Sequence, residues 1–247
     1  MLPSYLRLLS RVRDLPVPTL ADAVLFAAGE KRALRFALSE PSAEAVRSWA
    51  ESEGLRVAGR LMAVRRVAEG WNVVEPLDET SPTPLAGDRS ELLIVSRDAA
   101  LAEELCVCES SGEPARAGVL LDYPPCCVEA YASHCRYPGG WIAAALAPCD
   151  GAPPLCWCNR LPLAWQAPTF VGEIYPCSFR CSALAARGRR VHELLGALGL
   201  ASLARHTLEQ TLRPVVFRPD RPNPPGSAFV AVDHDAAGLP DFLEWSM

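Results

Sequence analysis

Two segments of the chain repeat a Tyr-Pro step that is followed by two cysteines. In residues 121–131 the step precedes the adjacent pair Cys126 and Cys127, and in residues 174–184 it precedes Cys177 and Cys181. Proline fixes φ and lacks an N–H, so it favours the first turn of a helix. Unpaired N–H groups and the helix dipole at such a start stabilise thiolate over thiol. The pattern therefore predicts that these four cysteines bind one shared metal ion or cluster.

The spacing of the four cysteines leaves three interpretations of the site. Structural zinc sites commonly use Cys-x2-Cys knuckles, and neither segment has that spacing. An iron–sulfur cluster accepts looser spacing and favours ligands that are all cysteine. Buried inert thiols or a dithiol/disulfide pair are the third interpretation. We expect an iron–sulfur cluster, with 4Fe–4S as the leading cluster type. Zinc is the alternative metal.

The adjacent pair limits how many of these cysteines can be ligands. On a regular helix the side chains of Cys126 and Cys127 diverge by about 100°, whereas Cys177 and Cys181 share one face if both lie in a first turn. Both members of the adjacent pair reach one cluster only from a distorted turn, so we expect one ligand and one free or catalytic thiol.

The number of ligands decides the expected function. Four ligands give a closed cluster for electron transfer or structural support. Three leave one iron open, as sulfur-transfer, desulfuration or redox enzymes require. No catalytic residue is identified. The alternative class is a zinc-stabilised, non-catalytic module that binds a partner protein.

Six further cysteines carry weaker patterns. They are Cys106, Cys108, Cys135, Cys149, Cys156 and Cys158. The first two and the last two form Cys-x-Cys pairs, and residues two apart on a helix point away from each other. Free cysteine is commonly buried as a small hydrophobic residue. We expect both pairs to be dispensable for the main site, and we assign no role to Cys135 or Cys149.

The amino-acid composition excludes some classes of binding partner. The 247 residues are 50% hydrophobic and carry a net charge of -5 with no basic tract, which argues against nucleic acid. No apolar run of about 18 residues predicts a membrane span, and residues 1–13 are typical of an amphipathic helix rather than a signal peptide. Phosphate-binding, serine-hydrolase, zinc-protease and radical S-adenosylmethionine motifs are missing. We expect a cytoplasmic protein whose partner is a small-molecule substrate or a redox protein.

The elements that must position these cysteines differ between the two halves of the chain. Periodicity and capping signals in residues 1–100 predict a helix at 41–53 with strands at 33–39, 55–67, 71–75 and 91–96. Asp98 is a helix N-cap. Later helices are predicted at 98–108, 114–121, 125–134, 178–198 and 200–212, with an irregular segment at 141–165 and a strand at 228–232. The fold class is α+β: a small N-terminal α/β unit (1–100), then a mainly helical cysteine-bearing region (101–247).

The two cysteine motifs together resemble a known prokaryotic family. Tyr-Pro-x-Cys-Cys at Cys126 and Cys127, followed downstream by Pro-Cys-Ser-x-x-Cys at Cys177 and Cys181, is similar to the pattern of the uncharacterised family catalogued as domain of unknown function 483. The resemblance covers residues 90 to 200 and does not include the Cys-Trp-Cys segment at Cys156. It implies that the four cysteines are a unit, and it supplies no reaction.

Overall fold

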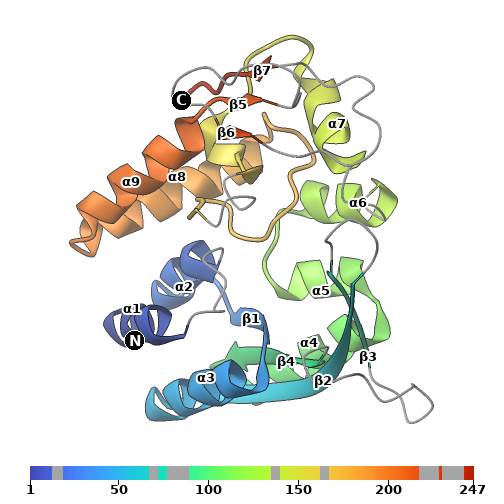
Figure 1. Ribbon diagram of the computed structural model, residues 1–247, viewed down its shortest axis with the longest axis vertical. Coiled ribbons are helices and arrows are strands. Elements are labelled where there is room, and N and C mark those ends of the chain that lie inside the picture. The colour runs from blue at the N-terminus through green and yellow to red at the C-terminus, as the bar shows by residue number, and fades with distance from the viewer. Residues whose placement is uncertain are drawn as a thin grey trace. The chain divides into compact units, whose positions relative to one another are not determined.

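The structure is a computed structural model that describes residues 1–12, 19–66, 72–76, 89–134, 140–161, 167–216, 228–229 and 242–247. The chain forms two compact units. The first contains Met1–Thr19 and Phe26–Asp122, and the second contains Leu20–Leu25 and Tyr123–Met247. Helices and strands occur in both, so the predicted α+β class is confirmed (Figure 1).

The first unit is built on a four-stranded antiparallel sheet in the order β1-β4-β2-β3. The strands are β1 (Ala33–Leu38), β2 (Arg56–Arg66), β3 (Asn72–Pro76) and β4 (Arg89–Ser96). Four consecutive β4 residues, Leu92 to Val95, are at most 2% exposed. Because successive side chains of a strand point to opposite faces, both faces of β4 are covered.

Helices surround this sheet. They are α1 (Leu2–Arg11), α3 (Glu40–Ser52), α4 (Ala99–Ser111) and α5 (Pro114–Leu120). The amphipathic helix predicted at the N-terminus is confirmed, since Leu2, Tyr5 and Leu8 are buried and the Tyr5 ring meets Trp49 of α3 at 5.2 Å. The Asp98 carboxylate accepts hydrogen bonds from the N–H groups of Ala100 and Leu101, as expected of an N-cap.

The boundary between the units differs from the one suggested near residue 100. Both α3 and α4 pack against β2 and β4, and α5 packs against α4, so the chain up to Asp122 belongs to the first unit. Asp122 takes a positive φ of 58° and accepts a hydrogen bond at 2.9 Å from the Arg32 N–H. This part of the second unit begins one residue later, at Tyr123, which is the first residue of the first cysteine motif.

The second unit is mainly helical. It contains α6 (Pro125–His134), α7 (Gly140–Leu146), α8 (Ser182–Ala197), α9 (Ala201–Leu212) and two short 3-10 helices, η1 (Ala147–Cys149) and η2 (Cys156–Cys158). Three two-residue strands, β5 (Val215–Val216), β6 (Ala228–Phe229) and β7 (Phe242–Leu243), form a second sheet. Helix α2 (Thr19–Ala27) contributes Leu20–Leu25, where Asp22 pairs with Arg187 of α8 at 2.8 Å.

One expectation for the second unit needs correction, and one is confirmed. The segment 141–165 is not irregular throughout, because α7, η1 and η2 lie within its described part. Of the strand expected at 228–232, the structure describes only β6, and the hairpin turn expected near residues 69–70 of the first unit also lies outside the described residues. The predicted stop between α8 and α9 is confirmed at Gly199, whose φ of 75° suits a residue without a Cβ.

Candidate metal centre

The adjacent pair Cys126 and Cys127 lies in the first turn of α6, as predicted. Pro125 is the first helical residue, where its missing N–H costs no hydrogen bond. The carbonyl of Pro124 accepts two hydrogen bonds, from Cys127 N at 2.9 Å and from Val128 N at 3.0 Å. The first of these is a 3-10 type bond, which tightens the turn that carries both sulfurs.

The second pair lies just before α8 rather than inside it. Cys181 is the N-cap, and its Sγ accepts a hydrogen bond from Leu184 N at 3.4 Å. The helix start predicted at Ser178 is therefore wrong, because α8 begins at Ser182, and Cys177 and Cys181 do not share a helical first turn. Instead, a tight turn in which Cys181 N donates to Ser178 O at 3.0 Å brings Cys177 back toward Cys181. Phe179 N anchors this turn by donating to Ala145 O at 3.0 Å.

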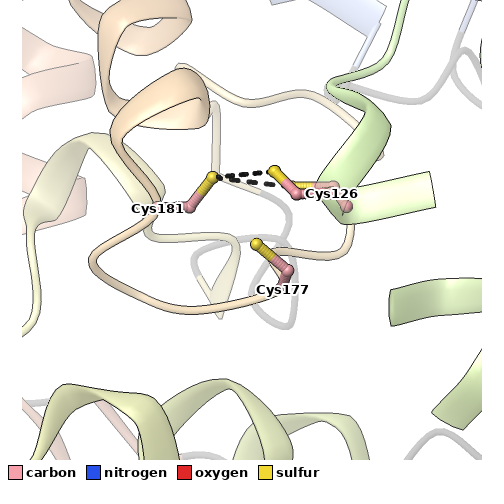
Figure 2. A group of neighbouring side chains, drawn as sticks. Cys126, Cys177 and Cys181 are labelled. Carbon is pink, nitrogen blue, oxygen red and sulfur yellow. Dashed lines mark hydrogen bonds between the residues drawn. The ribbon is translucent and has the colours of Figure 1, made fainter. Parts of the chain in front are cut away.

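These two segments bring four sulfurs together. The Sγ atoms of Cys126, Cys127, Cys177 and Cys181 all lie within 4.8 Å of one another. Cys181 is 3.6 Å from Cys126 and 3.8 Å from Cys127. Figure 2 shows the sulfurs of Cys126, Cys177 and Cys181 pointing toward a common centre. Both members of the adjacent pair reach the group, so the expected divergence of their side chains does not separate them.

The four thiols differ in their exposure. Cys127 and Cys181 are 2% and 7% exposed, Cys177 is half-buried, and Cys126 is exposed. One side of the group is therefore buried, where the start of α8 and Cys127 pack. The other side, at Cys126, is exposed to solvent. A metal held there is reached by solvent through the Cys126 sulfur.

Hydrogen bonds and burial shift the pKa values of three of these thiols in different directions. The thiol of Cys127, helped by the Leu184 N–H, lowers the pKa of Cys181 to about 5. The same bond to Cys181, together with burial, raises the pKa of Cys127 well above its ordinary value. Burial raises the pKa of Cys177 to about 12. Because metal ligands bind as thiolates, a bound ion displaces the protons of the buried thiols.

The donor set fits a metal. For a tetrahedral zinc ion with Zn–S bonds of about 2.3 Å, neighbouring sulfurs stand about 3.8 Å apart. The two separations at Cys181, 3.6 and 3.8 Å, are close to that value. In a 4Fe–4S cluster each cysteine binds a different iron, which holds the ligand sulfurs much farther apart than the ligands of one ion.

Of the other cysteines that the structure describes, two contact the segment that carries Cys177 and Cys181: Cys149, whose Sγ lies 3.7 Å from Ser178 Oγ, and Cys158. Cys106 and Cys108 are buried in α4 of the first unit, Cys135 lies outside the described residues, and Cys149 donates to Ala145 O. Cys158 is fully buried in η2 and donates its S–H to the Cys181 carbonyl at 3.4 Å. No sequence pattern connects Cys158 with the site, and the packing of η2 on α8 places it there. That Cys106, Cys108, Cys156 and Cys158 are dispensable for the main site stays a prediction.

We expect the adjacent cysteines to respond differently to substitution by serine. Cys127→Ser buries a hydroxyl and loses the hydrogen bond to Cys181. When a chelator keeps the chain free of metal, this variant should lower the free energy of unfolding by about 1–3 kcal/mol. Cys126→Ser changes an exposed side chain and should cost less than about 0.5 kcal/mol. Urea unfolding measures both. With metal added, Cys127→Ser should lose the ion while Cys126→Ser keeps it with weaker affinity. Equal metal loss in both variants would indicate a closed shell of four equivalent ligands.

Comparison with known proteins adds no relative. No protein family, curated protein or solved structure matches this chain. The resemblance to domain of unknown function 483 therefore stays a prediction. Within the described part of the chain, no helix is long and apolar enough to cross a membrane.

Proposed function

We propose that this chain is a metal-binding protein in which Cys126, Cys127, Cys177 and Cys181 hold the metal. The observation that carries the proposal is the convergence of four thiol sulfurs, from two distant segments, within 4.8 Å. A bound metal joins the start of α6 to the start of α8 and so stabilises the second unit. Such binding energy is also folding energy, because the unfolded chain does not hold the site together.

The sulfur spacing favours one tetrahedral ion, and zinc is the first candidate. Zinc accepts four thiolates without redox chemistry, and closed sites of this kind are structural. Two buried sulfurs, Cys127 and Cys181, supply the rigid side of the site, and the N–H groups of Cys177 and Leu184 donate to them. On this interpretation the chain is a zinc-stabilised module that acts by binding a partner protein.

An iron–sulfur cluster is the second candidate, favoured by the all-cysteine donors and by the exposed Cys126. Backbone N–H groups that donate to cluster sulfurs tune such centres, and Cys127 and Cys181 each accept one. A bound cluster would supply electron transfer, or sulfur transfer if one iron were open to a small-molecule substrate or a redox partner. Cys127, Cys177 and Cys181 would then hold it, and Cys126 would lie at its accessible side.

Anaerobic purification followed by metal and acid-labile sulfide analysis tests the proposal. A colourless protein with about one zinc per chain and no sulfide supports the single-ion site. A brown protein with comparable iron and sulfide supports the cluster. A chain that contains neither metal, and takes up neither zinc nor iron after reduction, contradicts the proposed function.

A further inference from the structure

We propose that Cys126 and Cys181 are a reversible oxidation site, whose disulfide withdraws two ligands from the metal and releases it. The inference rests on the proposed function for the metal it releases. The oxidation itself depends only on the two sulfurs. What points to it is the combination of one exposed thiol and one buried, hydrogen-bonded partner 3.6 Å away.

Exposure selects Cys126 as the sulfur that an oxidant meets first. Oxidation of thiols follows their thiolate character and their access to solvent. Of the four cysteines, Cys126 alone is exposed, whereas Cys127 and Cys181 are buried. A small peroxide arriving from solvent therefore contacts Cys126 before the others.

Cys181 lies close enough to Cys126 to complete the disulfide. Its Sγ lies 3.6 Å from that of Cys126, and the two side chains point toward each other (Figure 2). A disulfide brings sulfurs to about 2.05 Å, so the closing movement is about 1.5 Å. The Leu184 N–H donates to Cys181 Sγ at 3.4 Å and holds that sulfur in position beside Cys126.

The reaction needs hydrogen peroxide as the oxidant and proceeds in two steps. The Cys126 sulfur attacks one peroxide oxygen: an S–O bond forms, the O–O bond breaks, and the departing hydroxide takes a proton to become water. The Cys181 sulfur then attacks the Cys126 sulfenic acid: an S–S bond forms, the S–O bond breaks, and a second water leaves. Both sulfurs are oxidised and the peroxide is reduced. Cys127 and Cys177 take up protons as the metal departs, and a dithiol reductant restores all four thiols.

The test treats the reduced, zinc-loaded full chain with a small excess of hydrogen peroxide under argon. Released zinc is followed with a chromogenic chelator, and disulfides are mapped by mass spectrometry after the free thiols are alkylated. We expect about one zinc released per chain, as a single four-ligand site requires, and a predominant Cys126–Cys181 link that dithiothreitol reverses with recovery of zinc binding. A predominant link between another pair, or oxidation that leaves zinc bound, would overturn the inference.

Two variants separate oxidation from simple loss of structure. Cys126→Ser should slow zinc release by about tenfold or more, because reactivity follows exposure and the exposed thiol is gone. Cys108→Ser makes the same chemical change at a buried site in the first unit and should release zinc at the parent rate. Parent-like release from Cys126→Ser would refute the proposed role of Cys126. If the reduced parent chain binds no metal before peroxide is added, the proposed function fails, and the disulfide map of the metal-free chain decides the oxidation site on its own.

Discussion

Cys181→Ser is expected to abolish metal binding and to lower the stability of the metal-loaded second unit strongly. Cys181 lies 3.6 Å from Cys126 and 3.8 Å from Cys127 and joins the two segments. Apparent binding free energies of structural zinc sites are on the order of 10 kcal/mol, so losing even ~4 kcal/mol would lower the Tm of a unit this size by roughly 8–16 °C. Metal per chain and thermal unfolding by circular dichroism measure the effect.

Substitution by serine separates the role of Cys181 as a metal ligand from its role as the N-cap of α8. Cys181 caps α8 by accepting the Leu184 N–H, and serine is among the best N-cap residues, so the helix start keeps its hydrogen bond. The lost stability then reports the lost metal. The matched control is Cys108→Ser, whose metal content should equal that of the parent chain. Full metal occupancy and an unchanged Tm in Cys181→Ser would show that Cys181 is not a ligand.

Gly188→Ala is expected to destabilise the second unit by about 1–3 kcal/mol, as overpacking of a filled core does. Gly188 is buried in α8 where the helix meets η2, and an added Cβ would lie 2.6 Å from the carbonyl oxygen of Trp157. Backbone cannot rotate away as a side chain can, so α8 must move from η2. Because Cys158 of η2 hydrogen-bonds the Cys181 carbonyl, we also expect weaker metal binding. Urea unfolding and a zinc competition titration measure the two effects.

Gly196→Ala is the matched control on the same helix. An added Cβ at Gly196 would meet nothing within 4 Å. Alanine there should raise the free energy of unfolding by up to about 1 kcal/mol, because alanine has the higher helix propensity. If Gly188→Ala lowers the free energy of unfolding and Gly196→Ala raises it, the destabilisation comes from the contact between Gly188 and η2. Equal effects at both positions would contradict the close approach at Gly188.

The amino-acid sequence by itself determined the local features of the site. Tyr-Pro steps before Cys126 and Cys177 marked the two segments that converge, because proline's fixed φ and missing N–H act on the adjacent residues alone. The sequence also predicted the helix cap at Asp98 and the end of a helix at Gly199, since each depends on one side chain or its absence. Such signals identified the four cysteines as a set and the fold as α+β.

Tertiary structure decided everything that depends on residues far apart in the chain. It made Cys181 an N-cap and left Cys177 in a turn, because Phe179 is held by the carbonyl of Ala145. It assigned α4 and α5 to the first unit, because α4 packs on the sheet and α5 on α4. It buried Cys127 while leaving Cys126 exposed, although the two are adjacent, because burial is set by what packs against each side chain.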